Sequence, residues 1–436
     1  MKTIMTLAIL IAAFVIQSPA QDTLSLSIDK AIEIGLENSK ALKSSEFKVI
    51  AADAKASESD TYGLPSLKFQ GAYTRLSDIP PSQVTVFGNT FTLSPTILDN
   101  YTLKGTIQQP LFTGGKLSGA ADAAEYSAEA TKHDFGKDKA DVRYNIKAAY
   151  WNLYGAIEVS KFVDDNVSQI RSHVTDAENL MKQGMLTTND ILKVQVQLSD
   201  ALVRQINAKN GVQLAMIALD NTLGLPLSTY ITLTSTIEVK DRSWSAVDQL
   251  INHAFEKRPD ILAMNARVKA SEAGLSSARG GWWPQVYLVG DYNYLKPNQR
   301  IFPAQNKFKD TWDVSVSVSF DIWNWNQTGD QTTQAQAQVS QTQEGLSMLK
   351  DGVTLEVTQN YLSVNQARER QLVSEQGVAQ AEENYRVMKE KYKTGLIPNL
   401  ELKDAETALL QAKLNLTQSK VDYELAMARL SKAIGE

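Results

Sequence analysis

The chain of 436 residues contains no cysteine, only 12 prolines and three histidines. The absence of cysteine excludes disulfide frameworks, thiolate metal sites and the acylated N-terminal cysteine of a lipoprotein. The 49 acidic residues outnumber the 44 Lys and Arg, so a net charge of -5 offers no basic surface for nucleic acid. Hydrophobic residues make up 43% of the chain and charged residues 21%, proportions that are typical of a folded protein.

Motifs that carry catalysis or cofactor binding are also missing. The histidines, His133, His173 and His253, lie far apart and share no metal-ligand spacing, so we expect them on helix surfaces. The chain has no Gly-x-Ser-x-Gly, phosphate-loop or HExxH element. Carboxylates are plentiful, but on polar helices they are typical of solvated faces. We therefore expect neither enzyme activity nor a cofactor or metal.

The N-terminal segment has the pattern of an export signal. Lys2 precedes an apolar run over residues 4–16, and Ser18-Pro19-Ala20 then offers small residues where signal peptidase requires them. The alternative is a buried N-terminal helix, which needs no such order of features. The run of 13 residues is too short to remain in a bilayer, and no later segment reaches about 18. The sequence predicts a signal peptide over 1–20 and an exported mature chain without a transmembrane helix.

The most informative feature is an internal duplication. Residues recur at an offset of 219 and then of 211, as the pairs Glu37/Glu256, Pro65/Pro284, Gly71/Gly290, Tyr73/Tyr292, Tyr150/Tyr361, Gly184/Gly395 and Gly224/Gly435. The change of offset falls within the polar stretches 77–99 and 296–311, where a loop can shorten without disturbing a core. The sequence predicts two copies of one unit, over 21–225 and 246–436, with a linker over 226–245.

Each copy reads helix, strand, strand, very long helix, long helix, which makes the fold mainly α. The predicted helices are 28–59, 115–183, 189–223, 246–279 with a break at Pro259, 327–393 and 400–434; the predicted strands are 65–76, 101–110, 284–295 and 312–320. Apolar positions on the long helices are sparse and alanine-rich, as in the seam Leu402, Ala405 and Leu409. These helices fit a wall with water on both sides. A cytoplasmic coiled-coil scaffold would carry neither a signal peptide nor strands.

The strands alternate between an apolar and a polar face. Over residues 312–320 the tryptophan, valines and phenylalanine take every second position, and aspartate and serines take the others. This pattern fits an outer-membrane β-barrel, although a soluble sandwich with one wet face shows the same alternation. Four strands cannot close a barrel, since the smallest use about eight, and open edges are not viable in lipid. We therefore expect several protomers to share one barrel.

The chain resembles the TolC-type outer membrane efflux proteins over essentially its whole mature length. The features that carry the resemblance are the tandem repeat, the element Pro-Leu-Phe-Thr-Gly-Gly at 110–115, and two turns between long helices at 182–186 and 392–396. The resemblance implies a homotrimer in the outer membrane of a Gram-negative bacterium. Its 12-stranded barrel, four strands from each protomer, would lie in outer-membrane lipid and continue as a long α-helical periplasmic tunnel.

The same resemblance implies a function. The trimer would be the passive exit duct of a tripartite efflux or type I secretion system, coupled to an inner-membrane pump through a periplasmic adaptor. The alternative is an exported trimeric coiled-coil protein, structural or adhesin-like, without transport activity. A periplasmic adaptor also has helical hairpins, but it would need further domains in place of four amphipathic strands.

The second copy departs from the first at one element. It has Phe-Asp-Ile-Trp-Asn-Trp at 320–325 where the first copy has the element with two glycines. We interpret this as the loss of a tight turn in the second copy. The tryptophans then read as interfacial anchors.

The turns between the long helices supply two sets of candidate functional residues. The docking set consists of glycines that end a helix and the apolar residues that follow them, Gly184, Met185, Leu186, Gly395, Leu396 and Ile397. Exposed apolar residues at such a tip indicate a partner, and the resemblance implies that this partner is the adaptor. The alternative for the glycines is turn geometry alone.

The second set is a periplasmic gate, Asp190, Tyr392, Glu401 and Asp404. Glu401 and Asp404 are three residues apart and share one helix face, so a trimer would place them in two rings of carboxylates. The alternative is that they are ordinary acidic residues at a helix start, favoured by the macrodipole. The resemblance implies the gate and the role of Tyr392. Ile397 stands where the family can have an arginine.

Overall fold

The computed structural model describes residues 24–80, 82–94, 96–237 and 244–436. The predicted signal peptide lies outside these residues, as does part of the predicted linker. The chain divides into two compact units, and each takes segments from both sequence repeats. The helical unit contains the chain up to Glu46, Phe135–Pro259 and Lys350–Glu436. The sheet unit contains Phe47–Asp134 and Asp260–Leu349.

Helices make up most of the described chain. They are α2 (Ile28–Asn38), α3 (Lys40–Thr61), α4 (Lys116–Lys182), α5 (Thr188–Leu223), α6 (Val247–Lys257), α7 (Pro259–Arg279), α8 (Gln327–Lys393) and α9 (Asn399–Ala433). The predicted helix 28–59 is in fact two helices, because Ser39 interrupts it and its hydroxyl accepts a hydrogen bond from the Leu42 amide at the start of α3. The predicted break at Pro259 is confirmed.

The largest core of the helical unit surrounds Tyr150. This side chain is fully buried against α2, the end of α5 and a two-stranded parallel sheet of β1 (Leu24–Leu26) and β6 (Ile231–Leu233). Its hydroxyl donates to the Leu26 carbonyl at 2.9 Å and accepts from the Ser235 amide at 3.1 Å. A buried tyrosine needs such partners for its hydroxyl. Strand β6 lies within the stretch 226–245.

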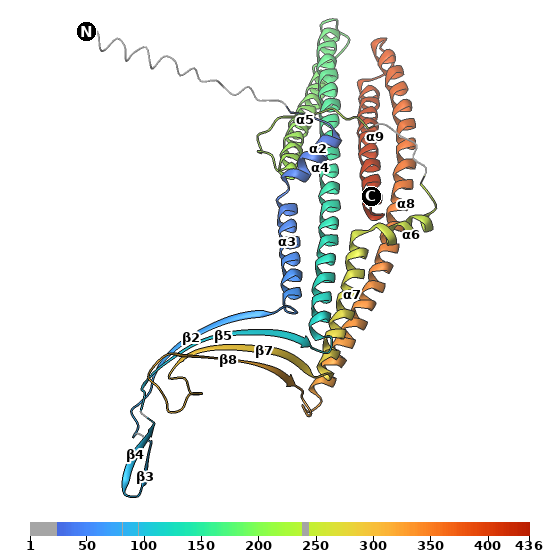
Figure 1. Ribbon diagram of the computed structural model, residues 1–436. Helices are drawn as coiled ribbons and strands as arrows, with labels where there is room; N and C mark the ends of the chain where they lie inside the picture. Colours follow the sequence, from blue (N-terminus) through green and yellow to red (C-terminus); the bar gives the residue numbers. More distant parts are fainter. Residues whose placement is uncertain (1–23, 81, 95, 238–243) are drawn as a thin grey trace, which may run out of the picture. The chain divides into compact units, whose positions relative to one another are not determined.

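The sheet unit contains a four-stranded antiparallel sheet of order β2-β5-β7-β8 (Figure 1). Its strands are β2 (Ser66–Arg75), β5 (Asp99–Phe112), β7 (Gln285–Lys296) and β8 (Lys309–Ser319), close to the predicted ranges. Within the described residues, the outer edges of β2 and β8 have no partner strand. A separate hairpin of β3 (Ser82–Val86) and β4 (Asn89–Ser94) lies in the stretch that the sequence indicated as a polar loop.

The register of the four strands aligns the alternating residues into two continuous faces. Across one row, Leu67, Ile107, Gly290 and Val314 are paired in turn, and the apolar side chains of this row are exposed. The neighbouring row pairs Lys68, Thr106, Asp291 and Asp313, so the opposite face is polar. An exposed apolar face opposite a polar one is typical of a membrane-spanning strand.

The described part of the chain holds no helix whose length and apolar character suit it to crossing a membrane.

The strand-to-helix turns of the two repeats have the same backbone. Gly114 and Gly115 have φ of 62° and 86°, and the equivalent Trp325 and Asn326 have φ of 54° and 65°. The amide of Lys116 donates to the Thr113 carbonyl at 3.1 Å, and the amide of Gln327 donates to the Asn324 carbonyl at 3.0 Å. The expectation that the second copy loses this turn is therefore wrong.

The first copy needs glycine at this turn because of what packs beside it. A Cβ atom on Gly114 would lie 2.4 Å from the Cβ of Trp283 and 2.8 Å from the Gly280 carbonyl oxygen. At the second turn Trp325 is 83% exposed, so a large side chain has room there. The difference between the two sequences thus follows from their neighbours rather than from the turn.

Candidate functional site at the helix tips

Both turns between long helices are built in the same way. Gly184 ends α4 with φ of 75°, and Gly395 ends α8 with φ of 71°. In the first turn the amide of Gly184 donates to Met181 and that of Met185 to Leu180; in the second the amides of Gly395 and Leu396 donate to Tyr392 and Lys391. These paired bonds define a Schellman motif, whose left-handed position favours glycine. Turn geometry alone therefore accounts for Gly184 and Gly395.

Asp190, a residue of the predicted gate, forms a capping box at the start of α5. Its carboxylate accepts hydrogen bonds from the Thr187 hydroxyl at 2.7 Å and the Thr187 amide at 3.2 Å. Lys193 donates to the other carboxylate oxygen at 3.2 Å. The bonds from Thr187, and then Lys193, lower the pKa of the Asp190 carboxyl. Asp190 thus has a structural role at the helix start, as the pattern Thr-x-x-Asp predicts.

Tyr392 lies half-buried at the end of α8. Burial raises the pKa of its hydroxyl, and the negative charges of Asp176 and Asp190 raise the pKa further. The structure therefore brings Tyr392 near Asp190, another predicted gate residue. It also brings in Asp176 on α4, which the sequence reasoning missed because nothing in its local pattern distinguishes it.

Glu401 and Asp404 are exposed in the first two turns of α9. The buried face of this helix carries Leu402 and Ala405. Among the described residues, no hydrogen bond or ion pair joins the carboxylate of Glu401 or Asp404 to another side chain. The two carboxylates share one open helix face, separate from the contacts that hold Asp190.

Apolar side chains at the two turns point away from the core. Met185 is 68% exposed and Leu396 is 74% exposed, whereas Leu186 and Ile397 are half-buried. Two further exposed leucines, Leu192 in α5 and Leu400 in α9, were not predicted. The sequence could have indicated both leucines, since each lies within about one or two turns of a predicted helix start. The exposed apolar group at the tips is larger than predicted.

One prediction about the histidines is wrong. His173 is buried, with 9% of its surface exposed, because α4 packs there against α5 and against Glu406 of α9. Within the described ranges, no group of three or more His, Asp or Glu side chains is arranged to hold a metal ion.

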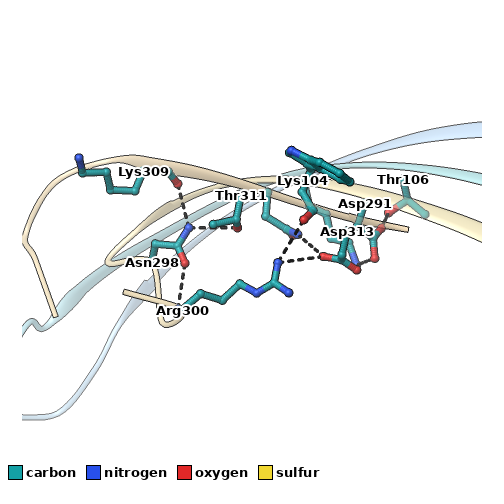
Figure 2. Close-up of polar contacts among 10 residues, drawn as sticks. Lys104, Thr106, Asp291, Asn298, Arg300, Lys309, Thr311 and Asp313 are labelled. Atoms are coloured by element: carbon teal, nitrogen blue, oxygen red, sulfur yellow. Dashed lines mark hydrogen bonds and ion pairs between the residues drawn. The ribbon is translucent and has the colours of Figure 1, made fainter. Parts of the chain in front are cut away.

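The polar face of the sheet carries an ordered set of contacts (Figure 2). Lys104 forms an ion pair with Asp291 at 2.9 Å, across β5 and β7. Arg300, from the loop between β7 and β8, reaches the Asp313 carboxylate at 3.5 Å. Asn298 fixes the loop through hydrogen bonds to the Lys309 carbonyl at 3.1 Å and the Thr311 hydroxyl at 3.2 Å. This face is a hydrophilic surface on which Lys104, Asp291, Arg300 and Asp313 are paired.

The sequence is similar to those of known proteins. The sequence profile of the outer membrane efflux proteins matches residues 31–225 and 250–436. The efflux protein BepC of Brucella suis is 22% identical over 340 residues, 77% of this chain and 73% of that protein. The outer membrane protein TolC of Vibrio cholerae is 20% identical over 315 residues, 72% of each chain.

Solved structures share the fold. The Campylobacter jejuni outer membrane channel CmeC aligns with a TM-score of 0.79 at 15% identity, covering 94% of this chain and 85% of that one. The outer membrane protein VceC of Vibrio cholerae aligns with a TM-score of 0.76 at 18% identity, covering 94% and 96%.

The chain belongs to the outer membrane efflux protein family. It is an outer membrane efflux channel, as predicted, and the adhesin-like alternative finds no support. The family is one of passive channels rather than of enzymes.

Proposed function

We propose that this protein is the exit duct of a tripartite efflux or type I secretion system. Three protomers close one 12-stranded barrel, and a periplasmic adaptor couples the trimer to an inner-membrane pump. The observation that carries this proposal is the four-stranded sheet, with one apolar face, one polar face and two free edges. In lipid an unpaired strand edge leaves its backbone groups unsatisfied, so β2 of one protomer must pair with β8 of the next.

The mature chain is proposed to begin after a signal peptide over 1–20 and to contain two efflux repeats over 21–225 and 246–436. Equal helix lengths support the duplication, since α4 and α8 each have 67 residues. The barrel strands come from both repeats, two from each.

A matched pair of arginine substitutions tests the barrel. Val316 is exposed on the apolar face of β8, and Ser317 is its neighbour on the polar face. Arginine on the lipid side of a barrel strand costs about 2–4 kcal/mol near the midplane. Val316→Arg should therefore reduce the heat-sensitive oligomer band from outer-membrane extracts, and Ser317→Arg should leave it unchanged. Equal tolerance of both substitutions would count against the shared barrel.

The helix tips are proposed to dock the adaptor through their exposed apolar residues. Met185 and Leu396 are the best targets because their side chains are exposed. They support the turns only through their backbone amides, which aspartate retains. The double variant Met185→Asp with Leu396→Asp should abolish export of a pump substrate, since charges would enter an apolar contact. Trimer yield in the membrane is the internal control. Export at the normal rate in this variant would remove the tips as the docking site.

Glu401 and Asp404 are proposed to form the narrow, cation-selective end of the tunnel, with Tyr392 and Asp190 beside them. The supporting observation is that both carboxylates are exposed on one face of α9. Rings of like charge in a narrow pore select ions of the opposite sign. The variant Glu401→Gln with Asp404→Asn should lose most of the cation selectivity of the trimer in planar bilayers. Glu383→Gln, an exposed site on α8, serves as the control. Unchanged selectivity in the double variant would place the constriction elsewhere.

A further inference from the structure

Four polar side chains meet inside the helical unit, one from each long helix. They are His173 of α4, Gln197 of α5, Tyr385 of α8 and Glu406 of α9. Glu406 is only 3% exposed, although α9 is otherwise a polar helix with an apolar inner seam. A carboxyl group at such a position must either find partners or lose its charge.

The Glu406 carboxyl group lacks a complete set of hydrogen-bond partners. The Nδ1 atom of His173 lies 3.2 Å from its Oε1, and the Nε2 of Gln197 donates to its Oε2 at a long 3.4 Å. Neither Oε1 of Glu406 nor the Tyr385 hydroxyl has a hydrogen-bond partner of good geometry among the described residues. These contacts satisfy a neutral acid better than a buried carboxylate, which needs several strong donors.

The charged groups near the pair are Asp165 and Asp176 of α4, Lys389 of α8 and Lys413 of α9. Asp165 and Lys413 line the cavity beside Glu406. Asp176 on α4 raises and Lys389 on α8 lowers the pKa of His173, while α5 contributes only the neutral Gln197. Burial has the largest effect and, together with Lys389, outweighs Asp176, so the pKa of the His173 imidazole is lowered. Burial raises the pKa of Glu406 to about 7, against the opposing effects of Gln197, Lys389 and Tyr385.

We propose that His173 and Glu406 form a buried site that binds a single proton from solvent. The proton lies on the carboxyl oxygen or on the imidazole, and the pair is electrically neutral in either case. Loss of this proton leaves a buried carboxylate, and a second proton leaves a buried imidazolium beside a neutral acid. A cavity of about 40 Å³ beside Glu406 is large enough for a water molecule to deliver the proton.

The pair makes the packing of the four helices independent of pH in the mildly acidic range. When the helices separate, His173 and Glu406 return to ordinary pKa values of about 6.5 and 4.3, so between these values the open form also binds one proton. Packed and open forms then bind equal numbers of protons, and the balance between them does not change with pH. Below this range the open form binds a second proton, and packing weakens.

Replacing either residue should make the stability of the packed helices depend on pH, and the two variants should differ in the direction of that dependence. In Glu406→Gln only His173 remains; because its pKa is lowered on packing, stability is lost as the pH falls below about 6.5. In His173→Gln only Glu406 remains; because its pKa is raised on packing, stability is lost as the pH rises from about 4.3 towards 7. Each slope approaches about tenfold in the opening equilibrium per pH unit.

Hydrogen exchange of the purified trimer tests these slopes between pH 5 and 6.5. Protection factors of amides around His173 in α4 and Glu406 in α9 should be flat for the wild type. They should fall towards low pH in Glu406→Gln and towards high pH in His173→Gln. Glu383→Gln, exposed on α8, should behave as the wild type does. A sloping wild type, or two single variants with the same sign of slope, would overturn the proposal.

A second test uses the wild-type protein alone and does not depend on the folding of any variant. Its protection factors should decrease below about pH 4.3, where the second proton enters the open form. Protection that stays constant down to pH 3.5 would also overturn the proposal.

A functional consequence rests on the proposed gate. The charge of Asp176 acts on both His173 and Tyr392. Weaker helix packing around His173 should therefore also weaken the packing at the helix tip that contains Tyr392. Open probability in planar bilayers should follow the exchange data, rising at low pH in Glu406→Gln and at neutral pH in His173→Gln. If the exchange slopes are present and the open probability does not change, the proton site stands and the gate assignment fails.

Discussion

The two repeats have nearly the same secondary structure but use it differently. Tyr150 and Tyr361 occupy equivalent positions in the 67-residue helices α4 and α8. Tyr150 is fully buried and links Leu26 to Ser235, whereas Tyr361 is half-buried and makes no such hydrogen bonds among the described residues. The segments around Tyr150, β1 and β6, have no counterpart beside Tyr361 in the described part of the chain. Duplication thus preserved helix lengths and turns, while packing partners diverged.

The strand-to-helix turns show the same divergence. The first copy packs its turn against Gly280 and Trp283 and requires Gly114, whereas the second leaves Trp325 in the open. A shared backbone with different neighbours predicts that equivalent substitutions will have unequal effects. The following four experiments test this in order of expected size.

The largest effect is expected from Gly114→Ala. The new methyl group would clash with Trp283, and the alanine would have to keep the left-handed backbone conformation of Gly114. The two effects together should cost about 2–5 kcal/mol of stability. Thermal denaturation of the detergent-solubilised protein, followed by circular dichroism, measures the loss. Trp325→Ala is the matched control and should change stability by less than about 1 kcal/mol. Similar losses at both positions would contradict the packing argument.

The next effect is expected from Tyr150→Phe. This change leaves the Leu26 carbonyl and the Ser235 amide without the bridging hydroxyl, at a cost of about 1–3 kcal/mol. Tyr361→Phe should be close to neutral in the same denaturation assay. A loss at position 361 as large as that at 150 would show that the repeats are more alike in packing than the contacts indicate.

Equivalent substitutions of the tip glycines, in contrast, should have equal effects in the two repeats. A methyl group added at Gly184 or at Gly395 would lie more than 4 Å from any atom beyond its chain neighbours, so only the positive φ opposes alanine. Gly184→Ala and Gly395→Ala should each cost about 1–2 kcal/mol. The measurement is the loss of amide protection in the last turn of α4 or α8. Clearly unequal losses would indicate a contact at one tip that the other lacks.

The smallest effect is expected from Trp325→Gly. Glycine relieves the backbone strain of the left-handed conformation at Trp325, which should stabilise the turn by about 1 kcal/mol. It also removes the contact with Trp323, whose ring centroid lies 5.6 Å from that of Trp325. We expect a rise in unfolding temperature of at most a few degrees. A clear fall would show that the aromatic pair contributes more than the strain costs.

Periodicity alone predicted most of the fold. The alternation in β8 and the heptad seam of α9 are local patterns, so strands and helices could be placed from sequence within a few residues. The hairpin β3–β4 was missed although Val84-Thr85-Val86 and Thr90-Phe91 alternate, because 77–99 was interpreted as a polar loop that shortens between the repeats. The break at Ser39 was missed because one serine weighs little against a long apolar stripe.

The candidate site was only partly predictable. The tip turns follow from glycine and helix-stop chemistry, and the capping box of Asp190 follows from the spacing to Thr187. The burial of His173 has no local signal, since it depends on Glu406, which lies far along the chain on another helix. Contacts of this kind arise only when the helices of both repeats pack together.

The free edges of β2 and β8 also bear on how a cell tolerates a defective copy. In the proposed trimer, a chain whose β2 edge is blocked by proline still offers an intact β8 edge and can join an assembly that it then prevents from closing. Such an allele should be dominant over the wild-type allele when both are expressed. A deletion that removes the whole sheet leaves no edge to join and should be recessive.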